Sequence, residues 1–218
     1  MVRVVSLDIS GTLVGPELMD YFWLDLVPLL YSKRQGIWLS EAKDEVYAAY
    51  EEVKKDELRF YLPSYWFGRF GIADQLDQAL DEARSRMRVY SDVASLRPLS
   101  GKYRLIVCSN MTDDFMRALT PNLGIDAEGC FSAVSAFSMT TKRKEFYEKV
   151  AEALQVSPSE IVHVGDDLKA DFEAPIEAGW NAIYLDRQHQ HPDISPSITN
   201  LGALPSTLEG LLVSEALG

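Results

Sequence analysis

Short apolar runs rich in β-branched residues recur along the chain, and longer stretches of mixed polarity separate them. The runs occupy residues 4–9, 103–110, 130–137, 160–167 and 181–186. Apolar runs of this length are typical of strands in a parallel sheet that helices cover on both faces. Because such strands are joined by right-handed crossovers, we predict an α/β fold with a doubly wound parallel sheet.

Residues 16–97, between the first and second predicted strands, follow a helical pattern instead. Ser40 is a candidate N-cap for a helix over residues 41–55, and apolar residues repeat at helical spacing at Leu76, Ala79, Leu80, Ala83 and Met87. The segment is too long for a loop and contains no clear strand. We therefore predict a helical insertion over residues 16–97 and a core formed by residues 1–15 and 98–218.

Two further regions complete the pattern. Aromatic side chains gather near the middle of the insertion, at Tyr65, Trp66, Phe67 and Phe70, where we expect packing more than ligand contact. Residues 189–205 contain several prolines and are predicted to form a loop before a short terminal element.

The composition limits the partners that the chain can bind. Its 218 residues are 47% hydrophobic, enough for a full core, and they carry 21 basic against 33 acidic side chains, a net charge of -12. This charge repels nucleic acid and anionic membranes, and no basic patch overrides it. Cys108 and Cys130 are isolated thiols, which indicates neither a disulfide framework nor a zinc cluster. We expect a cytoplasmic protein that neither binds nor spans a membrane.

Polar side chains follow the predicted strands where each strand ends. Asp8 ends the first strand, Ser109 and Asn110 end the second, and Asp166 and Asp167 end the fourth. Asp171 follows five positions after Asp166, at the start of the next helix. Because ligands of open parallel sheets bind beyond the carboxyl ends of the strands, we expect these side chains to meet at one rim.

Four carboxylates at one rim repel one another and require a positive charge between them. A set of oxygen ligands without histidine or thiolate favours Mg²⁺, which commonly binds through a few carboxylates and a substrate phosphate. Lys142 or Lys144, just before a predicted helix, can supply a further positive charge. The sequence therefore predicts a site for Mg²⁺ and a phosphate group.

In this order the motifs resemble the haloacid dehalogenase-like hydrolase superfamily over nearly the whole chain. The stretch DISGT at residues 8–12 is similar to the nucleophile motif, LIVCSN at 105–110 to the phosphate-binding motif, and GDDLKAD at 165–171 to the acidic motif. The resemblance implies a Rossmann-like core with a helical cap, which matches the predicted insertion. With the lysine at position 142 or 144, these stretches make four motifs in order, which are far more specific than any one of them.

The resemblance also implies a role for each site residue. Asp8 is the expected nucleophile that forms an aspartyl-phosphate, and Ser109 and the lysine hold the phosphate. Mg²⁺ is expected on Asp8, the backbone carbonyl of Ser10 and Asp166, with Asp167 as a further candidate and Asp171 behind them. We count Thr12 and Asn110 as candidate substrate-binding residues, although Thr12 also suits a purely structural hydrogen bond. The implied partner is a small phosphorylated metabolite.

This sequence departs from the superfamily pattern at two positions. The lysine lacks the proline that usually follows it, which leaves its register open between Lys142, our preferred match, and Lys144. Most phosphatases of the superfamily have a second aspartate where this chain has Ser10. That aspartate acts as general acid and base, which is typically worth about 10²–10⁴-fold, and a serine hydroxyl cannot exchange a proton near neutral pH as a carboxylate can. We therefore expect metal binding to survive and hydrolysis to be slow.

Relatives that lack the second acid define the alternatives. Haloacid dehalogenases use no metal and lack a GDD-type acidic pair, so GDD favours phosphate chemistry. Phosphonoacetaldehyde hydrolase uses a cap lysine as a Schiff base, but Lys54 and Lys55 are expected on a solvated helix face. A catalytically weak or inert regulatory protein that binds phosphate is the alternative from a different class.

Overall fold

The computed structural model describes residues 1–216, and its centre is a sheet of six strands in the order β3-β2-β1-β4-β5-β6. All neighbouring strands are parallel. The strands are β1 Val4–Leu7, β2 Arg104–Ser109, β3 Gly129–Ser132, β4 Ile161–Gly165, β5 Asn181–Leu185 and β6 Ser197–Ile198. The order turns from one direction to the other at β1 and β4, which confirms the predicted doubly wound α/β fold.

Both faces of the sheet are buried, because side chains alternate between two hydrophobic clusters along each central strand. Val5 and Leu7 of β1 belong to the larger cluster, whereas Val4 belongs to the smaller one together with Ile106 and Cys108 of β2. The core helices that cover the two faces are α6 Asp113–Leu119, α7 Ala133–Phe137, α8 Lys144–Leu154, α9 Ala174–Glu177 and α10 Leu204–Ala216. Burial on both sides explains why the strands are continuous apolar runs in the sequence.

The structure corrects three details of the predicted elements. Of the predicted strand 130–137, only the first part is strand β3; from Ala133 the chain forms helix α7, which Ser132 caps by accepting from the Ser135 N–H at 2.9 Å. The loop predicted over residues 189–205 contains the short strand β6. Ser40 is not an N-cap, because helix α3 begins at Leu39.

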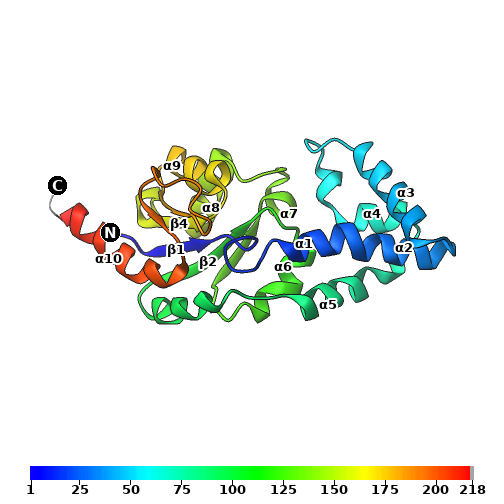
Figure 1. Ribbon diagram of the computed structural model, residues 1–218. Helices are drawn as coiled ribbons and strands as arrows, with labels where there is room; N and C mark the ends of the chain where they lie inside the picture. The colour runs from blue at the N-terminus through cyan, green and yellow to red at the C-terminus, as the bar shows by residue number, and fades with distance from the viewer. Residues whose placement is uncertain (217–218) are drawn as a thin grey trace.

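The segment between β1 and β2 forms a helical cap at one end of the sheet, to the right of the core in Figure 1. Its helices are α1 Glu17–Asp20, α2 Val27–Gln35, α3 Leu39–Glu51, α4 Pro63–Arg69 and α5 Leu76–Arg86, with a π-helical stretch, Tyr21–Leu26, joining α1 to α2. Trp66, Phe67 and Phe70 are buried in this cap, as packing residues would be.

Two chain segments connect the cap to the core, and they lie side by side. Val14 of the outgoing segment forms an antiparallel bridge with Val89 of the returning one, and the Tyr90 N–H donates to the Leu13 carbonyl at 3.0 Å. The 3₁₀ helix Ser91–Gly101 then packs on the core, where Ser95 Oγ donates to the Leu201 carbonyl at 3.0 Å. We propose that the cap returns to the core near residue 89, earlier than the boundary at residue 97.

Candidate active site

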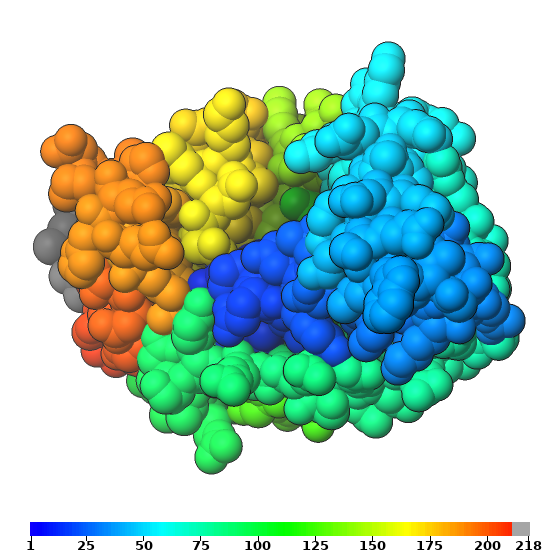
Figure 2. Space-filling view, turned by 45° about the vertical axis from the view of Figure 1, so that its right-hand side comes forward, coloured from blue at the N-terminus to red at the C-terminus, as the bar shows by residue number. Residues whose placement is uncertain are grey.

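A cavity of about 590 Å³ lies between the carboxyl ends of the strands and the cap. Figure 2 shows the molecule hollowed between the light-blue cap and the yellow segment near residue 170. The core side is lined by Asp8, Ser10, Ser109, Asn110, Lys142, Asp166, Asp167 and Asp171, and the cap side by Asp20, Trp23, Tyr50, Lys55, Phe60, Tyr61 and Trp66 among others. The structure therefore brings the predicted rim residues to one cavity, with the exception of Thr12.

Asp8 lies directly after β1, and the loop that follows it folds tightly against the acidic motif. The Asp8 N–H donates to the Val164 carbonyl at 3.0 Å, which ties the two strand ends together. Gly11 has φ +83°, and a Cβ there would overlap the Asp166 carboxylate. Gly11 is therefore required twice, for its backbone conformation and for the space that Asp166 occupies.

Lys142 is the lysine that reaches this carboxylate. Its buried ammonium forms ion pairs with Asp8 and, at 2.6 Å, with Asp171, while its backbone N–H donates to Asn110 Oδ1 at 2.7 Å. Lys144 lies on the exposed side of α8 and pairs with Glu148 at 3.5 Å. The register that the sequence left open between these two lysines is set by this geometry in favour of Lys142, and Asn110 fixes the loop that carries it.

Asp171 is held from behind by a buried hydrogen-bond chain that starts in the sheet. His163 Nε2 lies 3.1 Å from Asp171 Oδ1, and its Nδ1 lies 2.8 Å from Ser6 Oγ. Because the carboxylate can only accept, we assign the proton to Nε2, and the Ser6 hydroxyl then donates to Nδ1. Burial lowers the pKa of His163, which keeps the ring neutral.

The charges of the cluster do not balance within the protein. Burial raises the pKa of Asp8 to about 7 although Lys142 opposes the shift, and burial also raises the pKa of Asp166. Burial acts in the same direction on Asp171, but there Lys142 and His163 outweigh it and hold its pKa below the ordinary range. One lysine thus neutralises one buried carboxylate, and the remaining acids call for a further cation.

The carboxylates of Asp8, Asp166 and Asp171 lie close enough to share a cation. Each offers an oxygen atom within 4.8 Å of the others, and among the described residues they form the one such cluster found. Asp167, predicted as a metal ligand, lines the cavity but is not in this cluster. Its Oδ1 instead accepts from the N–H groups of Lys169 and Ala170 at 2.9 and 2.8 Å, which caps the π-helical turn Leu168–Glu173.

Three hydroxyl groups that the sequence analysis named have different surroundings. Ser10 and Ser109 line the cavity, and Ser109 Oγ accepts from the Met111 N–H at 3.3 Å. Thr12 is fully buried and donates to Asp166 Oδ1 at 2.9 Å. Thr12 therefore orients a carboxylate, in agreement with the structural hydrogen bond that the sequence analysis also suggested for it, and it does not line the cavity.

Arg187, two residues after β5, does not line the cavity but supports the loop that follows Asp8, a role that sequence reasoning missed. Its guanidinium donates to the carbonyls of Gly11 and Thr12 at 3.1 and 2.8 Å and to Asp92 at 2.8 Å. It thereby holds the loop after Asp8 to the segment that returns from the cap. Its distance of 175 positions from Thr12 leaves no local sequence signal for this contact.

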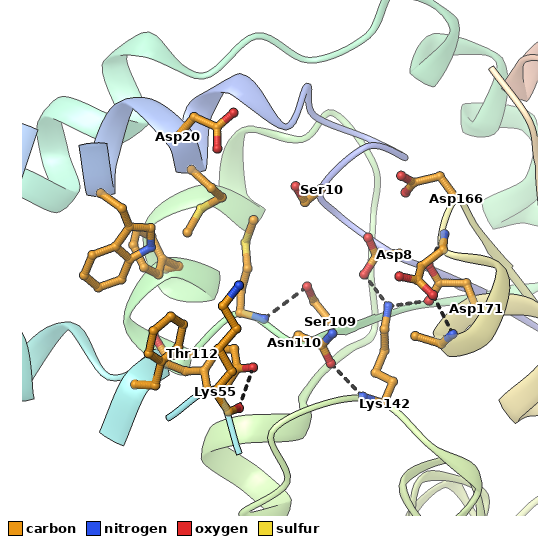
Figure 3. Close-up of a pocket in the computed structure, with 18 of the residues that line it drawn as sticks. Asp8, Ser10, Asp20, Lys55, Ser109, Asn110, Thr112, Lys142, Asp166 and Asp171 are labelled. Atoms are coloured by element: carbon orange, nitrogen blue, oxygen red, sulfur yellow. Dashed lines mark hydrogen bonds and ion pairs between the residues drawn. The ribbon is translucent and has the colours of Figure 1, made fainter. Parts of the chain in front are cut away.

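Lys55 also lies where the sequence did not place it. Helix α3 ends at Glu51, so Lys55 is on the turn that follows and not on a solvated helix face. It lines the cavity from the cap side, together with the cap carboxylate Asp20 (Figure 3).

The chain is similar to known hydrolases in sequence. A model of the family "haloacid dehalogenase-like hydrolase" matches residues 2–179. The chain is 25% identical over 182 residues to the GMP/IMP nucleotidase YrfG of Escherichia coli K12, an overlap of 82% of this chain and 80% of that protein.

Solved structures with a similar fold include both a phosphatase and a dehalogenase. The HAD phosphatase from Thermococcus onnurineus superposes with a TM-score of 0.74 at 19% identity, over 95% of this chain and 98% of that one. The 2-haloacid dehalogenase from Pseudomonas syringae pv. Tomato DC3000 superposes with a TM-score of 0.71 at 18% identity, over 97% and 100%. At these identities the likeness shows the fold alone, so the choice between the two chemistries depends on the site.

Proposed function

The chain belongs to the haloacid dehalogenase-like hydrolase family, and from this premise we propose that it is a Mg²⁺-dependent phosphatase acting on a small phosphomonoester. The observation that carries the proposal is the cluster of Asp8, Asp166 and Asp171 around a single lysine. A dehalogenase needs no cation and gains nothing from this surplus of negative charge. A phosphatase needs the surplus, because it places a divalent cation beside the phosphate.

The donor set fits Mg²⁺ because every available ligand atom is an oxygen. Asp8, Asp166 and the backbone carbonyl of Ser10 would hold the ion, while Asp171 is engaged by Lys142 and His163. When bound, Mg²⁺ offsets negative charge on the phosphate oxygens and on the crowded carboxylates.

In the proposed reaction, the phosphorus atom of the substrate undergoes two successive displacements. In the first, an oxygen of Asp8 forms a bond to phosphorus as the bond to the leaving oxygen breaks, which gives an aspartyl-phosphate. In the second, water attacks the same phosphorus and passes its proton to solvent water, and the bond to Asp8 breaks with release of phosphate and the free Asp8 carboxylate. Ser109 and Lys142 donate hydrogen bonds to phosphate oxygens in both steps.

Because Ser10 stands where a carboxylate would act, proton transfer to the leaving oxygen and from the attacking water is expected to be slow. A hydroxyl can donate a hydrogen bond to the leaving oxygen but cannot supply a proton near neutral pH. Asp20, on helix α1, is the carboxylate that lines the cavity from the cap side. We expect slow turnover, with an inert phosphate-binding protein as the limiting case.

The substrate is expected among small phosphorylated metabolites. The name of the Escherichia coli relative makes nucleoside monophosphates the first compounds to test. Within the described residues no helix has the length and apolar character needed to cross a bilayer. Both cysteines are free, which supports a reducing compartment and, we propose, the cytoplasm.

The test is hydrolysis of a panel of phosphomonoesters, phosphonoacetaldehyde and 2-haloacids, each with Mg²⁺ and with EDTA. We expect phosphate release that requires Mg²⁺ and that is abolished in Asp8→Asn, because an amide cannot attack phosphorus. Circular dichroism should show that this variant remains folded. Full activity in Asp8→Asn, or halide release that ignores EDTA, would contradict the proposal.

A further inference from the structure

The cap side of the cavity offers flat apolar surfaces. Tyr50 packs edge-on against Trp66 with ring centroids 4.7 Å apart, and Phe60 and Trp23 flank this pair. The polar atoms of two of these rings are bonded within the cap: Tyr50 Oη donates to the Trp23 carbonyl at 3.1 Å and Trp66 Nε1 to the Phe60 carbonyl at 2.8 Å. The half-buried rings of Tyr50 and Phe60 therefore offer a ligand carbon surface more than hydrogen bonds, and Trp66, which is only 1% exposed, packs against both.

Lys55 stands beside these rings on a turn with a fixed backbone. The Tyr61 hydroxyl donates to the Lys55 carbonyl at 3.0 Å, and the Glu57 N–H donates to the Lys54 carbonyl at 3.1 Å. Figure 3 shows the Lys55 amino group pointing into the pocket, away from the cluster around Lys142. The turn thus carries Lys55 at the edge of the space between cap and core.

The Lys55 amino group has no protein partner of its own. Within residues 1–216 it forms no ion pair or side-chain hydrogen bond, although acidic residues adjoin it; Glu57 is paired with Arg59 at 2.7 Å. Lys142, the other cation that lines the cavity, is already neutralised by Asp8 and Asp171. Lys55 is therefore the cation available to the part of a substrate that lies far from the phosphate.

We propose that Lys55 and the aromatic rings beside it form a subsite for the leaving group. The subsite takes a flat ring whose far edge carries an oxygen that accepts a hydrogen bond. The rings supply stacking or edge contacts, and the ammonium, with three donors and no acceptor, selects oxygen over an amino group. This inference rests on the proposed phosphatase function and names the substrate class of the same cavity.

The experiment compares matched substrates in the wild type, Lys55→Met and Lys54→Met. Inosine and adenosine monophosphate differ at ring position 6, oxygen against amine, and at the adjacent N1, which is protonated only in inosine, while carboxyphenyl and phenyl phosphate differ in a carboxylate alone. We expect the wild type to prefer the oxygen-bearing member of at least one pair by about 10-fold in kcat/KM, as a hydrogen bond to a charged donor implies. Lys55→Met should reduce this preference to about 2-fold or less.

Lys54→Met is the control, because Lys54 adjoins Lys55 but does not line the cavity. It should keep the wild-type preference. The pair that responds identifies the oxygen as part of a heterocycle or as a carboxylate. Absence of a preference in both pairs, or an equal loss in both lysine variants, would overturn the subsite.

Binding separates this inference from the proposed function. In the Asp8→Asn background, dissociation constants for the same compounds should show the same oxygen preference and its loss in Asp8→Asn/Lys55→Met. If the wild type hydrolyses phosphomonoesters and the dissociation constants ignore Lys55, the subsite is wrong and the phosphatase stands. If no phosphomonoester is hydrolysed but the oxygen preference appears in the dissociation constants, the phosphatase proposal is wrong and the subsite stands.

Discussion

Small residues shape this site as much as the charged residues do. Gly165 leaves space for the Asp171 carboxylate just as Gly11 does for Asp166, because a Cβ at either glycine would overlap the acid. Ser10 is the position where the proposed phosphatase chemistry would use a carboxyl group. Its side chain lines the cavity, so an acidic side chain in its place can be tested there.

Restoring that carboxylate should change which substrates are hydrolysed fastest. In the wild type, aryl phosphates should outpace alkyl phosphates, because their leaving oxygen needs little protonation. Ser10→Asp should speed alkyl esters by up to about 10²-fold and narrow the gap, since the carboxyl can donate the proton. The measurement is the alkyl-to-aryl ratio of kcat at saturating Mg²⁺.

Ser10→Asn is the matched control, because it has the size of the acid without the proton. If the wild type already hydrolyses alkyl phosphates as fast as aryl phosphates, another group carries the proton. Asp20→Asn would then be the variant that loses this rate, as the carboxylate that the cap contributes to the cavity.

The sequence predicted the site residues that directly follow a strand. It missed the residues that only long-range contacts bring near the site. Asp8, Ser109 and Asp166 follow the ends of buried strands, so a strand pattern is enough to locate them. Lys55 and Arg187 reach the site from separate parts of the chain, and no spacing within the sequence encodes those contacts.

At the scale of elements, the site depends on contacts between strand ends and the loops that follow them. The apolar runs predicted the central strands well, because burial on both faces leaves little room for polar residues. Residues 130–137 were harder to predict, since a short apolar run suits strand or helix equally and the Ser132 cap decides between them.

Arg187 holds the loop after Asp8 to the segment that returns from the cap, and we call this set of contacts the Arg187 clamp. Its guanidinium also lies over the Tyr90 ring, 4.0 Å from the centroid, which adds to its hydrogen bonds.

Removing this clamp should loosen the loop that carries Asp8. Arg187→Met removes the side-chain donor of the Gly11 and Thr12 carbonyls and leaves the Asp92 carboxylate with the Leu201 N–H but without its cation, which should cost about 1–3 kcal/mol in the free energy of unfolding. We expect kcat to fall as well, because Asp8, the proposed nucleophile, is less well positioned. Denaturant titration and steady-state kinetics measure the two effects.

Arg3→Met is the comparison for Arg187→Met, since Arg3 forms an exposed pair with Glu160 at 3.2 Å. Exposed pairs are worth about 0–1 kcal/mol. Equal losses of stability in the two variants, with kcat unchanged in both, would show that Arg187 is an ordinary surface pair.

For the whole molecule, the buried acids couple stability to metal and to pH. Folding raises the pKa of Asp8 from 3.8 to about 7, chiefly by burial. A carboxyl whose pKa is raised on folding opposes the fold once it ionises, so its contribution to stability falls as pH rises from about 4 to about 7. Mg²⁺ binds the ionised form and should counter this loss.

Mg²⁺ should therefore raise Tm, and by more at about pH 8 than at about pH 5.5, where the Asp8 proton competes with the ion. Asp166→Asn should remove most of the shift at both values, because one of the proposed ligands is lost. Differential scanning calorimetry with Mg²⁺ and with EDTA makes the comparison. A wild-type Tm that ignores both additions would show that no cation is held by these acids.

The bridge between Val14 and Val89 has a consequence for how this chain could be rebuilt. Partner residues of an antiparallel pair lie about 5 Å apart, so the two ends left by excising the intervening segment are already neighbours. A two-residue hairpin turn would close that gap without disturbing any strand of the sheet. A designed chain could therefore exchange the cap at these two positions and keep the strand order, provided that the new segment again covers the hydrophobic cluster that cap and core share.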